Sequence, residues 1–225
     1  MARETYQRSL DALHGGVVEL GEKVLVQLDR GLDALVRHDR ALAAGLNAAD
    51  DVIDDETLRI EKACIDLVSL QQPVAGDMRL ITASFKIVTD LERIADLAVN
   101  LGDYGGAAET LDMVAPEIID AIGRLVAEML EAAMTAYAER DAEAAEAVLR
   151  RDQDVDDLTW GTIRSFIKQL YLSEQLSHGE PEAERIASQA LPILLSMRDL
   201  ERVGDHAANI AGRVVYLVTG RHERF

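Results

Sequence analysis

DLERIADLAVN (Asp90–Asn100) and DLERVGDHAAN (Asp199–Asn209) are two copies of one eleven-residue pattern. Both fit D-L-E-R-[IV]-x-D-x-A-x-N, and corresponding residues lie 109 positions apart. Helix propensity alone does not place the same polar residues at the same positions of two segments, so the agreement indicates an internal duplication. We expect the function to reside in this repeated unit.

Matching residues also precede each copy, but at a different separation. Four pairs share an offset of 102, namely Asp39 with Asp141, Asp50 with Asp152, Asp54 with Asp156, and Thr57 with Thr159. The difference between the two offsets, 109 − 102, places seven additional residues in the later half, where SHGEP (177–181) lies. Since a structural repeat tolerates insertions in its loops, the pattern predicts two copies of one helical unit.

Apolar residues recur at three- and four-residue spacing along six stretches, as is typical of amphipathic helices. Asp39 and Asp141 are suited to N-cap positions and Pro116 to a first helical turn. We expect an all-α fold of two tandem three-helix bundles with antiparallel neighbouring helices, over residues 1–104 and 115–225 with a linker at 105–114. The six helices are expected at 5–36, 39–70, 74–101, from 116, from 141 to about 176, and 182–218.

The amino-acid composition limits the kinds of partner that the protein is expected to bind. The formal net charge of -18 argues against direct nucleic-acid binding and favours a metal cation or a basic protein surface. No run of about 18 apolar residues and no signal-peptide pattern is present, so we expect a cytoplasmic protein without membrane insertion. The single cysteine, Cys64, falls among apolar helix positions and is expected to be a reduced core thiol.

The repeated acidic residues form pairs on helical faces. Glu92 and Asp96 lie about 40° apart around a helix, in the middle of an apolar stripe, whereas Asp90 points elsewhere. Each half therefore directs two pairs, from two antiparallel helices, into its interior or onto a face that it would otherwise bury. The candidate metal ligands are Asp50, Asp54, Glu92, Asp96, Asp152, Asp156, Glu201 and Asp205.

Like charges four residues apart destabilise a helix, and desolvated carboxylates cost several kcal/mol each, so these acids need compensation. Proton sharing with raised pKa values is one answer, and a salt bridge from Arg198 to Glu201 is another. Bound cations are the third, because ligand sets made only of oxygen suit ions such as Mg, Mn or Fe. Geometry alone leaves metal binding and an ordinary solvated acidic face equally open.

Other polar residues of the repeated pattern have simpler interpretations. Asp90 with Arg93 and Asp199 with Arg202 have the i,i+3 spacing of surface ion pairs. His206 projects about 100° away from Asp205, so it is expected to face solvent rather than complete a metal site.

No nucleophile elbow, phosphate-binding loop or Cys-x-x-Cys motif is present, so we assign no catalytic residue and expect no enzyme. A carboxylate-bridged di-iron oxidoreductase is the enzymatic alternative, but that class uses Glu-x-x-His on two helices, and neither half has it. A metal-free helical interaction module is the third possibility.

The sequence resembles the PhoU family through LQQPVAGDMR (Leu70–Arg79), the two DLER strings and VVYLVTG (Val214–Gly220). This resemblance implies two three-helix bundles, a homodimer, and multinuclear sites for Fe, Mn, Mg or Zn on the eight acidic residues. It also implies a negative regulator of phosphate uptake and phosphate-starvation signalling that links the ATPase of a phosphate ABC transporter to a sensor histidine kinase, reaching the membrane only through these partners. Ile163 takes the place of Glu61 in the second half, so the two sites are not expected to bind the same number of metal ions.

Overall fold

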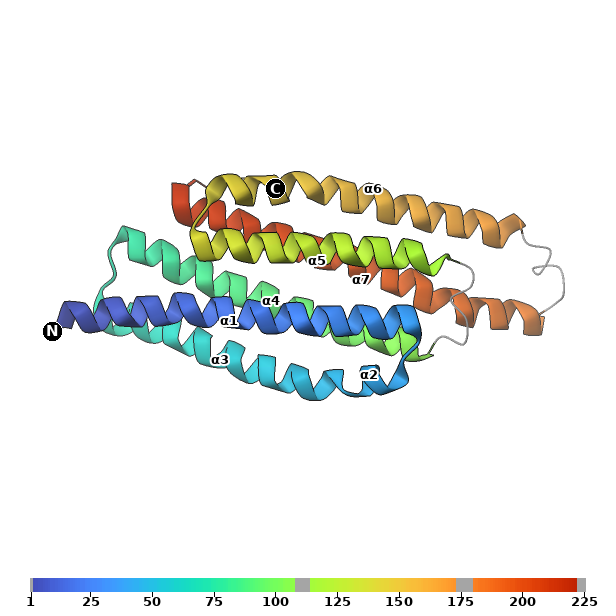
Figure 1. Ribbon diagram of the computed structural model, residues 1–225, viewed down its shortest axis with the longest axis horizontal. Helices are drawn as coiled ribbons and strands as arrows, with labels where there is room; N and C mark the ends of the chain where they lie inside the picture. Colours follow the sequence, from blue (N-terminus) through green and yellow to red (C-terminus); the bar gives the residue numbers. More distant parts are fainter. Residues whose placement is uncertain (1, 108–113, 173–179, 222–225) are drawn as a thin grey trace.

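The computed structural model describes residues 2–107, 114–172 and 180–221, and these ranges contain helices and no strands. Six helices are long and one is short (Figure 1). The all-α fold with tandem repeats is therefore confirmed. The helices are α1 (Ala2–Arg37), α2 (Arg40–Ala44), α3 (Leu46–Gln71), α4 (Ala75–Ala107), α5 (Pro116–Glu139), α6 (Ala142–Leu172) and α7 (Glu180–Thr219).

The predicted capping residues occupy the predicted positions. Asp39 Oδ1 accepts hydrogen bonds from the backbone N–H groups of Ala41 (2.9 Å) and Leu42 (3.0 Å). Asp141 Oδ1 accepts the equivalent bonds from Glu143 and Ala144 at 2.9 and 3.0 Å. Each cap satisfies backbone donors that have no partner inside the helix, so the corresponding helix of both repeats begins at the same place.

Two helix boundaries differ from the prediction. The expected second helix is interrupted at Gly45, which separates the short α2 from α3. Helix α4 continues to Ala107, through part of the stretch expected to be a linker, because Gly105 allows α4 to pass so close to α1 that a side chain there would collide with the backbone of Ala34 and Leu35. The end expected for the fifth helix, near Leu176, lies outside the described residues.

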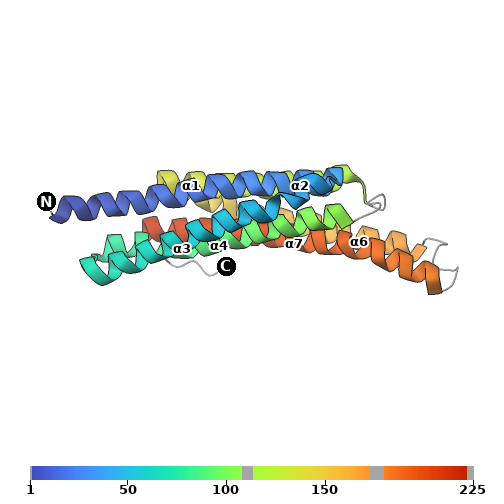
Figure 2. The same ribbon diagram turned by 90° about the horizontal axis from the view of Figure 1, so that it is seen from below.

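The two repeats share one continuous core. Helices α1 and α5 lie on one side of α4 and α7, and α3 and α6 flank the assembly at its outer edges (Figures 1 and 2). Helix α4 contacts α1 and α3 of its own repeat and α7 of the other, and α1 also contacts α5. The buried apolar cluster runs through helices of both repeats, and Cys64 is part of it, as expected.

Equivalent residues make equivalent contacts between α1 and α5. A Cβ atom added at Gly21 would lie 2.5 Å from Met134 Cε, and one added at Gly123 would lie 2.7 Å from Leu32 Cδ2. The offset of 102 relates both members of these contacts, because 21 + 102 = 123 and 32 + 102 = 134. The duplication therefore extends to the packing of one repeat against the other.

Gly31 is the sharpest test of this close packing. A methyl group at Gly31 would collide with the backbone carbonyl of Ala98, whereas one at Gly15, also in α1, would meet nothing within 4 Å. We expect Gly31→Ala to lower the free energy of unfolding by about 1–3 kcal/mol through overpacking. Gly15→Ala should raise it by up to about 1 kcal/mol through helix propensity. Urea denaturation of both variants measures the difference, and equal midpoints would contradict the packing described.

Candidate metal-binding seams

The first seam is the line along which α3 and α4 meet. Helix α3 contributes Asp50 and Asp54, and α4 contributes Glu92 and Asp96. The charge of Asp96 raises the pKa of both aspartates of α3, and the charge of Asp54 raises the pKa of Glu92. The structure thus brings the two predicted pairs of this repeat together.

The second seam is the equivalent line between α6 and α7. Asp152 and Asp156 of α6 face Glu201 and Asp205 of α7. The charge of Asp205 is the largest charge effect that raises the pKa of Asp152, and the charge of Asp156 raises the pKa of Glu201 and of Asp205. The same four-carboxylate arrangement therefore occurs twice.

The seams lie at the surface and not in the bundle interior. The side chains of Glu92 and Asp96 are 27% and 45% exposed, and Asp54 and Asp205 are exposed residues. The interior alternative is therefore wrong. The apolar positions that flank these acids turn inward against α1 and the other repeat, which leaves the acids at the margin of the core.

Partial burial nevertheless perturbs the carboxylates. Burial, followed by repulsion from Asp54 and Asp96, raises the pKa of Asp50 to about 6, even though Gln27 Nε2 donates a 2.7 Å hydrogen bond to its carboxylate. Burial is also the first cause of the raised pKa values of the other shifted seam acids. These are Asp54, Glu92, Asp152, Glu201 and Asp205.

The positive charge beside the first seam comes from a residue that the sequence did not single out for it. Arg93 Nε lies 3.5 Å from Glu92 Oε2, and its Nη1 lies 3.5 Å from Asp96 Oδ2. In the second repeat, Arg198 does not bind Glu201 as suggested but donates to Asp199 Oδ1 at 2.9 and 2.7 Å. The prediction that Arg198 offsets the negative charge of Glu201 is therefore wrong.

Trp160 belongs to the second seam, although the predicted site residues do not include it. Its Nε1 donates a 3.1 Å hydrogen bond to Glu201 Oε1 across the seam. The signal was available, because Trp160 follows Asp156 by four residues and so shares its helical face.

Two contacts between α4 and α7 overturn the surface interpretations of their polar residues. Asp199 is completely buried and accepts a 3.0 Å hydrogen bond from the Tyr104 hydroxyl. His206 does not face solvent, since its Nδ1 lies 2.9 Å from Asp90 Oδ1 and its side chain is 18% exposed. These aspartates therefore connect the two repeats instead of forming surface ion pairs with Arg93 and Arg202.

The donor set suits a cation, but the side chains are not gathered around one. Asp152 Oδ1 is buried without a hydrogen-bond partner, surrounded by the other carboxylates of its seam. Among the described residues, no three His, Cys, Asp or Glu side chains lie close enough together to hold an ion. Binding would therefore require side-chain rotation along the seam, which half-exposed carboxylates permit.

Each seam continues into exposed apolar side chains at matching positions. Leu58 and Ile65 of α3 are 63% and 57% exposed, and their equivalents Trp160 and Ile167 of α6 are 50% and 51% exposed. Both repeats therefore present apolar surface beside the acids on the outer face of α3 or α6. Such repeated exposure points to a contact surface.

The fold and the seams together define a duplicated helical-bundle protein with two acidic, candidate cation-binding surfaces. The chain belongs to the PhoU family, because the sequence profile of the PhoU domain matches residues 17–104 and 119–214. These two matches coincide with the two repeats.

Full-length relatives agree with this assignment. The chain is 33% identical to the "Phosphate-specific transport system accessory protein PhoU homolog" of Clostridium acetobutylicum, over 98% of this chain and 97% of the relative. A relative of the same description from Deinococcus radiodurans is 31% identical over 98% and 100% of the two chains. The relatives are thus described as accessory proteins of a transport system and not as enzymes.

Solved structures share the architecture. The crystal structure of PhoU from Pseudomonas aeruginosa has a TM-score of 0.85 at 30% identity and covers 96% of this chain and 100% of its own. The regulatory protein PhoU from Streptococcus pneumoniae shows the same fold, with a TM-score of 0.86 at 24% identity over 98% and 100% of the chains. In the described part of this chain, no helix has the length and apolarity that crossing a bilayer requires.

The raised pKa of Asp50 predicts a pH-dependent stability of metal-free protein. A carboxyl with a higher pKa in the folded state favours folding most below its unfolded value near 4, and this contribution is lost as pH rises through about 6. In EDTA, the free energy of unfolding of wild type should therefore fall between pH 4 and 7. Asp50→Asn should reduce this fall by about 1 kcal/mol, a figure discounted for partial solvent exposure.

Asp66→Asn is the matched control, because Asp66 lies exposed on the same helix, outside the seam. Its denaturation curves from pH 4 to 7 should follow wild type. An Asp50→Asn profile that also follows wild type would show that repulsion at the first seam has no effect on stability.

Proposed function

We propose that this protein is a metal-binding negative regulator of phosphate uptake and of phosphate-starvation signalling. In this function it is a cytoplasmic homodimer that acts as an adaptor between the ATPase of a phosphate ABC transporter and a sensor histidine kinase. The observation that carries the proposal is the presence, once in each repeat, of two acidic pairs that face one another across a partly buried seam. The description of the relatives as accessory proteins of phosphate-specific transport supports the cellular context.

The metal part of the proposal rests on the need to offset four neighbouring carboxylates. In each seam the two pairs from adjacent helices would hold the ion or ions: Asp50, Asp54, Glu92 and Asp96 in the first, and Asp152, Asp156, Glu201 and Asp205 in the second. A divalent or trivalent cation held by these residues would supply the positive charge that offsets their repulsion. Fe, Mn, Mg and Zn all accept oxygen ligands, so the choice of ion depends on coordination number and availability.

A metal-free interaction module is a second candidate, supported by the exposed apolar residues along the outer helices. Leu58, Ile65, Trp160 and Ile167 would then be the functional surface, and the acids would serve to keep that surface soluble. The two candidates differ in what the acids do, so metal content separates them.

The single tryptophan of the chain provides a specific reporter of the second seam. Because Trp160 Nε1 bonds to Glu201, a cation drawn to Glu201 and Asp205 should change the tryptophan emission. We expect Mn²⁺ added to metal-stripped protein to produce a saturable change, which Glu201→Gln with Asp205→Asn abolishes. The fold should survive in this variant, because removing two charges relieves repulsion.

Glu92→Gln with Asp96→Asn is the matched control in the other repeat. It should retain the fluorescence response while total metal, measured by elemental analysis, falls by about half. A response that persists without Glu201 and Asp205, or protein that binds no metal in either form, would remove the metal-binding part of the proposal.

The regulatory part predicts a phenotype. Cells that lack the protein should express phosphate-regulated genes constitutively at high phosphate, and the wild-type gene should restore repression. Transcript levels measured at high and low phosphate test this expectation. Unchanged repression in the deletion strain would contradict a negative regulator, whereas full complementation by a variant with all eight seam acids replaced would favour the metal-free module.

A further inference from the structure

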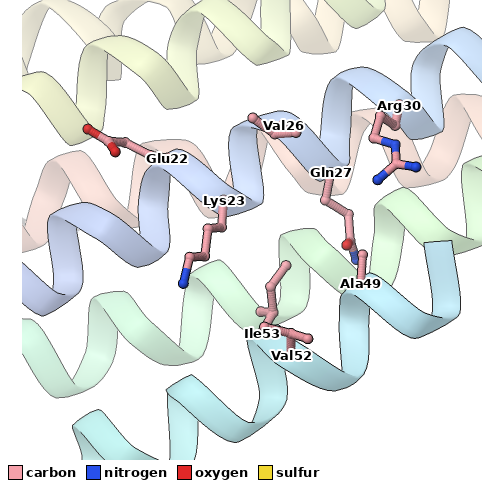
Figure 3. A pocket seen from close by; sticks show the side chains of 8 residues that line it. All are labelled: Glu22, Lys23, Val26, Gln27, Arg30, Ala49, Val52 and Ile53. Carbon is pink, nitrogen blue, oxygen red and sulfur yellow. The ribbon is translucent and has the colours of Figure 1, made fainter. Parts of the chain in front are cut away.

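A groove lies between α1 and α3, on the side of α3 that faces α1. Its volume is about 450 Å³, and α1 and α3 provide its two walls (Figure 3). Val26 and Val52 on these walls are 58% and 52% exposed, whereas Ile53 at the base is 2% exposed. The groove is therefore apolar and open, a shape that suits side chains of a larger partner better than a fully enclosed small molecule.

The duplication shows that the residues lining this groove differ from their equivalents in the second repeat. The offset of 102 pairs Val26 with Glu128 and Ala49 with Arg151. Arg151 Nη2 lies 2.6 Å from Glu128 Oε2, so an ion pair spans α5 and α6 where the first repeat has two small apolar side chains. The first repeat has its own ion pair between these helices, Lys23 with Glu56, but it has apolar side chains where the second repeat has Glu128 and Arg151.

Polar groups at the groove indicate the chemistry of its occupant. Arg30 projects toward Ala49 and, within the described chain, makes no ion pair (Figure 3). Lys23 also points into the groove, where it pairs with Glu56, and the carboxylate of Glu22 points away from α3. An uncommitted guanidinium in a chain of net charge -18 favours an acidic group on the occupant.

Gln27 forms part of the base of the groove. This residue is 2% exposed and lies at the base of the groove, where its Nε2 is engaged by Asp50 and by the carbonyl of Ala95. Its Oε1 is buried beneath the groove surface and has no hydrogen-bond partner. A peptide segment supplies both groups that the accessible surface of the groove favours: a carboxylate for Arg30 and aliphatic side chains for Val26 and Val52.

We propose that the α1–α3 groove binds a short segment of a partner protein in which aliphatic side chains are flanked by acidic residues. This inference rests on the proposed adaptor function, since it assigns one of the surfaces through which an adaptor must act. The residues that contact the segment are not seam acids, although Gln27 at the base of the groove is bonded to Asp50. The inference places this contact on the first repeat.

The second repeat supplies the variant that tests the proposal. Val26→Glu with Ala49→Arg transfers the ion pair of Glu128 and Arg151 into the groove and should close it without disturbing the fold. A fluorescein-labelled peptide of sequence DELLED should bind wild-type protein saturably, as measured by fluorescence anisotropy. We expect the closed variant to bind at least tenfold more weakly and Arg30→Gln to lose preference for the acidic peptide over KKLLKK.

Glu128→Val with Arg151→Ala is the matched control, because it changes the same positions in the other repeat. It should bind DELLED within twofold of wild type. Circular dichroism and metal content of the closed variant should equal those of wild type. The proposal is overturned by equal DELLED binding to the closed variant, by no saturable binding to wild type, or by preference for KKLLKK. None of these results affects the gene-expression test, so the two proposals fail separately.

Discussion

The structure depends on the burial of the two repeats against each other. Apolar burial contributes about 25 cal/mol per Å², and a unit of half this chain's length buries a smaller fraction of its surface than the whole chain does. The core therefore extends through helices of both repeats, and α4 packs directly on α7. The glycines at 21 and 123 bring α1 and α5 close enough for this shared core to form.

The shared core also determines where the acidic seams lie. Because α4 and α7 face each other across the middle of the molecule, α3 and α6 are left at the edges (Figure 1). Each outer helix buries one face and leaves its junction with the central helix partly open. Full burial of four carboxylates would cost many kcal/mol, and full hydration would give no reason for their pKa values to rise. The seams lie between these limits, so a cation would have access to the carboxylates and would reduce their mutual repulsion.

The sequence predicted features that are local or repeated. The caps at Asp39 and Asp141 and the pairing of acids four residues apart depend on short-range geometry. Their meeting across a seam follows from the short connections that make successive helices antiparallel. The constant offset of 102 residues revealed the internal repeat, which the apolar pattern of any one helix could not reveal.

Features that depend on neighbouring helices could not be predicted in the same way. A helical wheel gives the direction of Asp199 or His206 around α7, but it does not say that α4 occupies that direction. The helical wheel alone therefore assigns both residues to the surface, whereas in the structure they contact Tyr104 and Asp90 of the other repeat. The same limit applies to Glu92 and Asp96, which a helical wheel places in the middle of the apolar face of α4. Because α4 packs against α1, α3 and α7, its apolar residues point toward several neighbours, and the middle of that face does not mark the core.

The duplication conserved the carboxylates more closely than their surroundings, which gives the two seams different electrostatics. In the first seam, Gln27 donates to Asp50. The offset of 102 places Met129 at the position of Gln27, and a thioether has no such donor. This substitution accounts for the buried, unpartnered Oδ1 of Asp152. A buried charged acceptor without a partner costs more than about 1–3 kcal/mol, a cost that the first seam reduces with an amide. We therefore expect that a bound cation would stabilise the second seam more than the first, because the second repeat lacks this hydrogen bond and has more uncompensated negative charge.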